Sequence, residues 1–462
     1  MLSDRMRARL PWLLFAAILC FHFAAAWRGG PAPNWHGQTS EYYPLLTDAF
    51  LAGQTSLRVK PPAALLALAN PYDPVANAQL RMHDVSLYRG KYYLYFGPAP
   101  VVTLFLPYRL LTGSHLPTRA AVALFCAAGF ACSCALFFLV ARREKWNLPS
   151  WLASASVLSL GTSSAVFFLL IRPSFYEVAI AAGYCFLSAG FLLGALALVS
   201  APASPKLLAA AGLCFGLAAG CRPNFALLAV AMVLLVSSHL RADKRRAAAF
   251  VLPLALCGVL LAWYNYARFQ NPFEFGARYE LTNGVSNQKH LLTLGLANIV
   301  PGFYYLVYSP PWIGSHYPFL SFSDTSSVFS RLPEGFSVGP NIGVLWVAPI
   351  ALLGLLAPSV WRRGRVQPFL TFPSTRFAVA ALCISGIGTL ALFLLLGWSD
   401  GRYNVDYVPE LLLLSWLFLG ALWQAVPETP RVRALWFRCA VVGLTLYSMS
   451  LDFWMCFDHG SR

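Results

Sequence analysis

The chain has 462 residues, of which 58% are hydrophobic and 11% charged, with a mean hydropathy of +0.60 and a formal net charge of +16. Soluble domains carry roughly 25% charged residues, so this composition excludes an ordinary soluble enzyme. Apolar runs of about 20 residues recur along the chain, as helices that cross a bilayer require, and they argue against a barrel of short alternating strands. The sequence therefore predicts an all-α polytopic membrane protein.

The first apolar stretch, 11–27, follows the basic segment MLSDRMRARL and has two interpretations. A secretory signal has this layout, and Ala24-Ala25-Ala26 resembles a cleavage site. Bulky Leu19 precedes Cys20, however, where a lipoprotein signal has a small residue, and many further spans follow. We therefore interpret this stretch as an uncleaved first membrane helix.

About eleven membrane spans are expected, within a single integral membrane domain. In chain order they cover residues 11–27, 117–141, 149–171, 176–200, 206–220, 224–240, 247–265, 340–360, 376–397, 407–426 and 434–452. The stretches 98–112 and 290–308 are expected to be helices at the interface. This predicts four parts: a first outer loop 28–116, core helices 117–265, a second outer loop 266–339 and C-terminal helices 340–462.

The charges give the orientation. With the N-terminus inside, the inner loops hold 18 Lys and Arg and four acids, a net charge of +14, whereas the outer side keeps +2 of the total of +16. Basic inner loops are what the positive-inside rule requires. We expect a multi-pass protein of the cytoplasmic (inner) membrane with its C-terminus outside. Its basicity then reflects the basic inner loops of this topology, so membrane lipids are expected as partners and no nucleic acid is.

The first outer loop opens with GQTSEYYPLLTDAFLAGQ, residues 37–54, which holds two carboxylates and two tyrosines. If 40–52 is helical, Glu41 and Asp48 lie seven residues apart on one face and look into one cavity beside Tyr42 and Tyr43. An amphipathic helix on the membrane surface, with its acids in water, explains the pair equally well.

Farther along this loop, ANPYDPVANAQLRMHDVSLYRGKYYLYFGPAP at 69–100 mixes charged side chains with aromatic ones. Sugars are bound by aromatic faces together with carboxylates and amides, so we expect substrate contacts from His83, Asp84, Lys91 and Tyr93. An interfacial aromatic belt would explain the tyrosines but leaves the acids without a reason.

Four arginines are expected near the outer ends of spans: Arg172, Arg222, Arg268 and Arg402. Arg suits phosphate because its planar fork makes two parallel hydrogen bonds and stays charged. Snorkelling to lipid headgroups is the alternative for each of them. Arg402 lies in SDGRYNVDYVPE, so Tyr403 and Asp406 join it as expected substrate contacts.

No cofactor is expected. Nearly all of the eleven cysteines fall in apolar segments, where a thiol behaves as a small hydrophobic group. Cys132 and Cys134 have no second pair or histidine cluster nearby, so the sequence does not support a divalent metal site.

Three segments carry a family resemblance: YYPLL…AFLAGQ in the first loop, GKYYLYFGPAP…LP before the second span, and the late GRYNVDYVPELLLL. Together they resemble the GT-C class of membrane glycosyltransferases, and within it the bacterial branch of the lipid A aminoarabinose transferases and protein O-mannosyltransferases. The resemblance implies a GT-C-like fold and transfer, with inversion, of a sugar from a polyprenyl-phosphate donor. The acceptor would be an outer-face glycan, lipid or protein.

Such enzymes use a carboxylate of the first loop as general base. The family usually has Asp-Glu at the start of that helix, whereas this chain has Ser40-Glu41. Glu41 is therefore the first candidate for the base, with Asp84 second and Asp48 third. Two other functions stay open: a transporter or flippase for a lipid-linked substrate, and a catalytically inactive relative.

The orientation makes a prediction that reporter fusions test. Fusions at 242–246 should give a cytoplasmic fluorescent signal and no phosphatase activity, because this loop carries a cluster of cations. Fusions at 320–330 should give phosphatase activity. A cytoplasmic signal at 320–330 would overturn the predicted topology.

Overall fold

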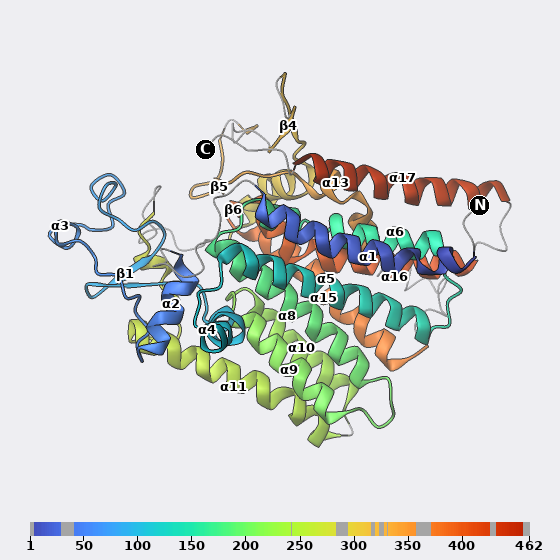
Figure 1. The fold of residues 1–462 in the computed structure, drawn as a ribbon, viewed down its shortest axis with the longest axis horizontal. Coiled ribbons are helices and arrows are strands. Elements are labelled where there is room, and N and C mark those ends of the chain that lie inside the picture. The colour runs from blue at the N-terminus through green and yellow to red at the C-terminus, as the bar shows by residue number, and fades with distance from the viewer. Residues whose placement is uncertain are drawn as a thin grey trace.

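The computed structural model describes residues 4–28, 41–241, 243–282, 294–315, 319–322, 328–329, 331–356, 371–425 and 431–455. Ser40 and the predicted outer C-terminal tail beyond Met455 lie outside these residues. The described chain is mostly helical, and its long helices lie side by side in one bundle (Figure 1). Loops and short strands extend from one end of that bundle.

Six helices in the described part of the chain are long and apolar enough to cross a membrane. They are α1 (Asp4–Trp27), α5 (Thr118–Arg143), α8 (Phe175–Ala197), α11 (Lys244–Phe269), α15 (Pro373–Leu395) and α17 (Arg431–Met455). Shorter helices stand among them: α6 (Ser150–Thr162), α7 (Phe167–Ile171), α9 (Pro205–Ala219), α10 (Phe225–His239) and α16 (Val408–Ala425). The predicted class, an all-α polytopic membrane protein, is confirmed.

Two predicted spans differ from the helices observed. The span 149–171 is split into α6 and α7, because the chain turns at Ser163–Val166, where Ala165 has a φ of +60°. The described residues of 340–360 form the short helix α13 (Val344–Val347) and the 3-10 helix η5 (Pro349–Leu356) rather than one continuous α-helix. Pro349 contributes to that break, because proline has no N–H to continue an α-helix.

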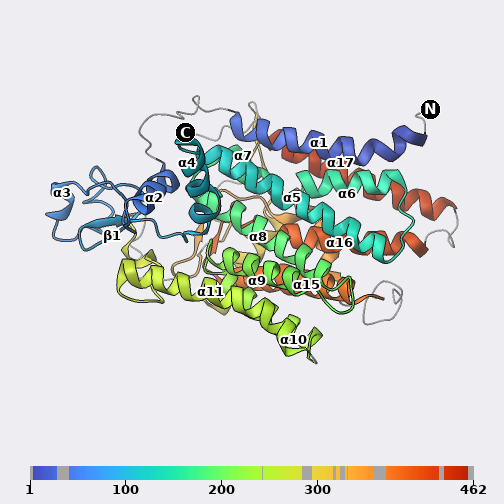
Figure 2. The same cartoon turned by 60° about the horizontal axis from the view of Figure 1, so that its bottom comes forward.

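The bundle is layered. α5 packs against α8, α8 against α9, and α9 against α11, whereas α1 covers α5 and α6 on the opposite side (Figure 2). A buried polar contact joins α1 to α6, because His22 Nε2 lies 2.8 Å from the carbonyl oxygen of Gly161. Inside a bilayer such a group needs an internal partner, and this carbonyl supplies it.

The extension at one end of the bundle comes mostly from the predicted first outer loop. It contains α2 (Tyr42–Leu51), α3 (Ala63–Leu66) and a hairpin of β1 (Ser86–Tyr88) and β2 (Lys91–Tyr93), in which Ser86 faces Tyr93. The π-helix η1 (Val101–Phe105) and α4 (Leu106–Thr112) lead to α5. The stretches 40–52 and 98–112 are thus largely helical, as the sequence predicts.

Short elements make up the described parts of the predicted second outer loop. They are η2 (Ala277–Tyr279), η3 (Leu296–Asn298), α12 (Ile299–Phe303), η4 (Tyr304–Tyr308), β3 (Trp312–Ile313), β4 (Leu320–Ser321) and β5 (Ser337–Val338). β5 pairs in parallel with β6 (Trp398–Ser399), just before the 3-10 helix η7 (Gly401–Asp406). The two loops also meet directly, because Asp84 N–H donates to Leu281 O at 2.9 Å.

Gly97 brings the first loop against the end of α9. The Ala99 N–H donates to Gly220 O at 3.2 Å, and a Cβ on Gly97 would lie 1.9 Å from that oxygen. This close approach requires glycine, because any side chain would collide with backbone that cannot move aside. The contact places the GPAP segment beside the turn that carries Arg222.

Gly97→Ala should therefore destabilise the protein by about 1–3 kcal/mol, the usual cost of forcing extra atoms into a packed site. Thermal unfolding in detergent would measure the change. Gly258→Ala is the matched control, since a Cβ there meets nothing within 4 Å, and it should leave the Tm unchanged or slightly raised. Equal Tm values for the two variants would contradict the proposed contact.

Candidate functional site

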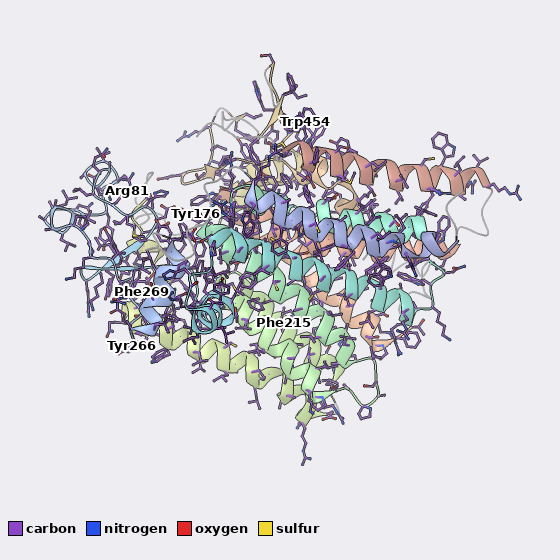
Figure 3. The ribbon with its side chains drawn as sticks, viewed as in Figure 1. Arg81, Tyr176, Phe215, Tyr266, Phe269 and Trp454 are labelled. Carbon is purple, nitrogen blue, oxygen red and sulfur yellow. The ribbon has the colours of Figure 1, made fainter. Side chains whose placement is uncertain are left out.

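Several segments meet where the extension joins the bundle: the start of α2, the stretch 83–96, the start of α8, the turn after α9, and η7. Tyr176, at the start of α8, lies at this junction in Figure 3, whereas Arg81 lies farther out in the extension. The predicted outer ends of several spans thus come together at one end of the bundle. We call this junction the loop-side site.

Arg402 is the central cation of the loop-side site. Its Nη2 lies 3.1 Å from Asp400 Oδ2 and its Nη1 lies 3.5 Å from Glu177 Oε1. The guanidinium also stands over the Tyr176 ring, 4.5 Å from the ring centre. Burial alone lowers the pKa of Arg402, but Asp400 and its other neighbours raise it overall, so this side chain stays charged.

Glu177 owes its position to the start of α8. Ser174 is the N-cap, and the Ser174 N–H donates to Glu177 Oε2 at 3.0 Å, completing a capping box. Such a box satisfies helix N–H groups that have no partner within the helix. Glu177 Oε2 is held by the cap, which leaves Oε1 directed to Arg402.

Arg222 forms a second, more deeply buried ion pair. It bonds Asp406, whose Oδ2 also accepts from Asn224 Nδ2 at 3.1 Å. Burial raises the pKa of Asp406 to about 6, although Arg222 and Asn224 oppose the rise. Tyr403 connects the two arginines, since its ring centre lies 5.0 Å from the Arg222 guanidinium and 5.9 Å from that of Arg402.

Asp84 faces the same place from the extension. Its side chain is 15% exposed, and Oδ2 lies 3.3 Å from Nε2 of His83. Burial raises the pKa of Asp84, and electrostatic interactions with His83 and Arg402 act against that rise. Arg402 and Asp84 are therefore close enough to interact electrostatically.

Aromatic rings line the junction between Asp84 and α8. Tyr42 lies against Phe175, with 4.1 Å between ring centres, and its hydroxyl donates to His83 O at 2.6 Å. Phe96 meets the Tyr176 ring edge-on at 5.9 Å. Burial raises the pKa of Tyr42 to about 12, so its hydroxyl remains a hydrogen-bond donor at neutral pH.

Glu41 and Asp48, the predicted acid pair, both make contacts with the segment leading into α5. Glu41 Oε2 accepts from the backbone N–H and the hydroxyl of Thr118, each at 2.8 Å. The two Asp48 oxygens lie 3.1 and 3.0 Å from His115 Nε2. Both acids therefore contact residues at or just before the start of α5.

Five other predicted site residues have contacts elsewhere among the described residues. Arg268 is 1% exposed and donates to Leu94 O and Asn265 Oδ1 at 2.5 Å each. Arg172 is exposed and stands over the Phe322 ring. Tyr43 is fully buried against Phe105, Tyr93 packs on Phe269, and Lys91 is exposed at the hairpin turn. None of these contacts joins them to Arg402.

Glu177, Tyr176 and Asn224 were missed by the sequence reasoning. The pattern Ser174-x-x-Glu177 before an apolar run is a capping-box signature and would have marked the start of α8. It does not reveal that the free carboxylate oxygen meets Arg402, because the two residues lie 225 positions apart. Asp400 pairs with Arg402, whereas Asp406, expected beside Arg402, binds Arg222.

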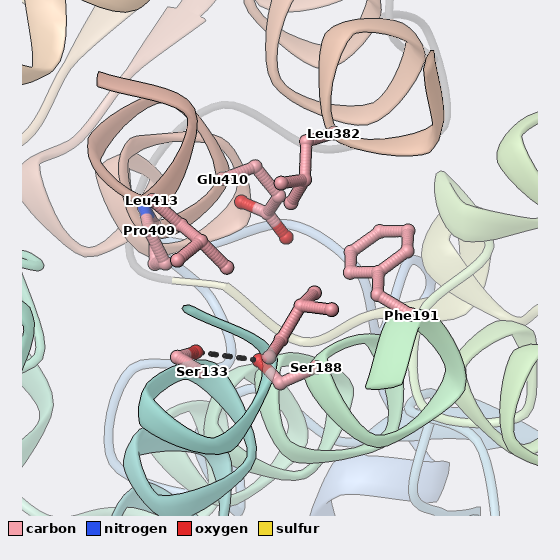
Figure 4. A pocket seen from close by; sticks show the side chains of 8 residues that line it. Ser133, Ser188, Phe191, Leu382, Pro409, Glu410 and Leu413 are labelled. Carbon is pink, nitrogen blue, oxygen red and sulfur yellow. Dashed lines mark hydrogen bonds between the residues drawn. The ribbon is translucent and has the colours of Figure 1, made fainter. Parts of the chain in front are cut away.

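A second polar spot lies inside the bundle (Figure 4). The buried Glu410 of α16 faces a small cavity with Ser133 and Ser188, whose hydroxyls lie 3.4 Å apart. This cavity is too narrow for a water molecule, so it is not a substrate site. In the described residues, no group of three or more His, Cys, Asp and Glu side chains is placed to hold a metal ion.

Gly339 makes the Asp400–Arg402 pair possible. Its N–H donates to Ser399 O at 2.8 Å, and a Cβ on it would lie 2.4 Å from Asp400 Oδ2. Gly339→Ala should destabilise the protein by about 1–3 kcal/mol. Gly339→Ala should destabilise the protein less when Asp400 is already Ala. A double-mutant cycle of unfolding free energies should give a coupling of at least about 0.5 kcal/mol. Additive effects would show that Asp400 is not the group displaced.

Among known proteins, solved structures resemble this chain, whereas no known family profile and no curated protein sequence matches it. The crystal structure of ArnT from Cupriavidus metallidurans bound to undecaprenyl phosphate is similar, with 16% sequence identity and a TM-score of 0.47. That likeness covers 96% of this chain and 76% of ArnT.

Proposed function

We propose that this protein is a glycosyltransferase of the cytoplasmic membrane that moves a sugar from a polyprenyl-phosphate donor to an acceptor hydroxyl at the outer face. The observation that carries the proposal is Arg402, a charged and 22% exposed guanidinium held at the end of membrane helices with Asp84 nearby. A cation, a carboxylate and aromatic faces together suit transfer of a sugar from a phosphate.

Arg402 has hydrogen-bonding capacity left for a ligand. Its contact with Asp400 is a good hydrogen bond, but the 3.5 Å contact with Glu177 exceeds the usual range of about 2.7–3.2 Å. A phosphate oxygen that approaches Nη1 would replace a weak partner with a strong one. Arg222 is less available, because its side chain is 10% exposed and bonded to Asp406.

The aromatic side chains support a sugar substrate. Tyr42, Phe175 and Tyr176 stand between Asp84 and the start of α8, and Phe96 closes one side. The apolar C–H faces of a sugar stack on such rings, while its hydroxyls need carboxylates and hydroxyls as partners. Tyr42 comes from α2, Phe175 and Tyr176 come from the start of α8, and Phe96 comes from the loop between β2 and η1.

The location supports a lipid-linked donor. The loop-side site lies at the ends of membrane helices, so a donor can keep its tail in the bilayer and still bring its phosphate to Arg402. Residues of α11 such as Leu252, Leu256 and Val259 remain exposed and apolar, as a helix facing lipid requires. The acceptor, a glycan, lipid or protein, then approaches from the water side.

The chemistry follows from the groups present. The acceptor oxygen attacks the anomeric carbon and loses its proton to a carboxylate base, while the bond from that carbon to the phosphate oxygen breaks. Attack from the face opposite the phosphate inverts the anomeric centre. The bonding electron pair goes to the phosphate, which gains charge as it leaves, and Arg402 stabilises that charge. The protein needs no cofactor for this step.

Transport of a lipid-linked substrate is the second candidate function. Glu410 favours it, because ionisable groups inside a membrane often mark transport pathways. The cavity at Glu410 is too narrow for water, however, and the segments that form the loop-side site meet where the extension joins one end of the bundle. A flippase would move the intact donor across vesicles without consuming it, whereas the proposed enzyme releases polyprenyl phosphate.

Arg402→Ala should lower kcat by about 10²–10³-fold, because a contact that strengthens as the phosphate leaves is lost. Arg402→Lys should also lower kcat, since an ammonium group cannot make the two parallel hydrogen bonds of a planar guanidinium. The assay is sugar transfer from polyprenyl-phosphate donors at matched expression.

Arg58→Lys is the control, because Arg58 is an exposed arginine of the first loop. It should behave like the wild type. Near-normal kcat in Arg402→Lys would remove Arg402 from the phosphate site and favour simple contact with lipid headgroups. Release of intact donor on the far side of vesicles, with no transfer, would replace the enzyme with a flippase.

A further inference from the structure

We infer that Asp84 is the general base of the transfer proposed above, and that Glu41 and Asp48 instead fasten α2 to the start of α5. This inference rests on the proposed function for the reaction itself. It departs from the expectation that the acid of the first-loop helix takes the proton. Three sets of contacts carry it: those of Glu41, those of Asp48 and those of Asp84.

Glu41 is engaged as a helix cap. Its Oε2 accepts both the N–H and the hydroxyl of Thr118, the first residue of α5. The first N–H groups of a helix lack partners within it, and a carboxylate there is also favoured by the helix dipole. This oxygen is therefore used to join α2 to α5, 77 residues later in the chain.

Asp48 makes the second join, two turns along α2. Its two oxygens share His115 Nε2, and Oδ1 lies 3.6 Å from Arg109 Nε. The His115 side chain is 12% exposed and Asp48 is 25% exposed. An acceptor hydroxyl would have to displace these partners before Asp48 took its proton.

Asp84 is positioned by its backbone. Its φ is +51°, a left-handed conformation that few residues other than glycine adopt, although Asp is among those enriched there. Two hydrogen bonds fix it: Asp84 N–H to Leu281 O and Leu281 N–H to Val85 O, both 2.9 Å. A residue held in an uncommon conformation by long-range contacts points to a functional constraint.

The surroundings of Asp84 suit proton transfer. It is largely buried and faces the loop-side site, where burial raises its pKa and so strengthens it as a base. His83 Nε2 lies 3.3 Å from Asp84 Oδ2, and the His83 side chain is 47% exposed. The proton that Asp84 takes from the acceptor can therefore leave to water through His83.

The step balances without another reactant. Asp84 takes the proton of the acceptor hydroxyl as its oxygen forms the bond to the anomeric carbon. The bond from that carbon to phosphate breaks, and its electron pair leaves with the polyprenyl phosphate at Arg402. Proton and electron pair thus end at opposite sides of the sugar, on Asp84 and on the phosphate.

The test compares three full-length variants in nanodiscs: Asp84→Asn, Glu41→Gln and Asp48→Asn. Asp84→Asn should lower kcat by about 10²–10⁴-fold, the usual effect of removing a general base, and leave binding of polyprenyl phosphate within a few-fold of wild type. Glu41→Gln and Asp48→Asn should lower Tm by roughly 2–4 °C with kcat within a few-fold of wild type. Thr118→Val removes a partner of Glu41 and should reproduce its effect.

The pH profile separates a base from a structural role. The acid limb of kcat/KM should lie above the usual range of an aspartate, because burial raises the pKa of Asp84. His83→Gln removes an electrostatic interaction that lowers the pKa of Asp84, so the limb should move to higher pH. Other groups facing Asp84 should stay unchanged in this comparison: Arg81, Arg402, Tyr42 and Tyr95.

Wild-type kcat in Asp84→Asn would overturn the inference. So would a loss of 100-fold or more in Glu41→Gln at unchanged Tm, which would return the role of base to Glu41. If the wild-type protein transfers no sugar from any polyprenyl-phosphate donor, the proposed function falls, and the inference with it. If both the wild type and Asp84→Asn are active, Asp84 is not the general base, and the proposed function still stands.

Discussion

The loop-side site depends on the pairing of Arg402 with Asp400 and Glu177. A guanidinium at the edge of a membrane bundle needs carboxylates to hold it, since an unpaired buried charge is costly. Asp400 comes from the segment paired with β5, and Glu177 from the first turn of α8. The pair therefore joins two helices far apart in the chain, and any change to either carboxylate moves the cation.

The carboxylates also determine what the site can accept. Arg402 and Arg222 face three acids, which are Asp400, Glu177 and Asp406. An anionic phosphate would be repelled if all three kept their charges and positions. Burial raises the pKa of Asp406 to about 6, and Glu177 is the weaker partner of Arg402. Under the proposed function, an arriving phosphate competes with Glu177, so changes at this residue should alter the affinity for the donor.

The sequence predicted the features that depend on local pattern. Apolar length marked most spans, and α2 begins at Tyr42 within the predicted 40–52. It could not predict which partner each charged side chain meets, because that depends on contacts across hundreds of residues. Arg268 and Arg402 look alike in the sequence. Arg268, however, is 1% exposed and bonded to backbone and amide oxygens, whereas the Arg402 side chain is 22% exposed. The prediction of one continuous span over 340–360 was wrong, because an apolar run gives no sign of the helix break at Pro349.

Glu41 and Asp48 illustrate the same limit. Their spacing of seven predicts a shared face of one helix, and the structure places Asp48 in α2 and Glu41 at its N-cap. Shared spacing does not determine what the two side chains contact, however. Glu41 contacts Thr118 and Asp48 contacts His115. Asp84 lies in irregular backbone with no period to reveal it, and its position comes from Leu281 in the other large loop. Both large loops thus contribute to the site: α2 is anchored to α5, while Leu281 bonds the backbone at Asp84 and Val85. Under the proposed function, the acids beyond the first membrane crossing divide the work: Glu41 and Asp48 fix α2, and Asp84 takes the proton.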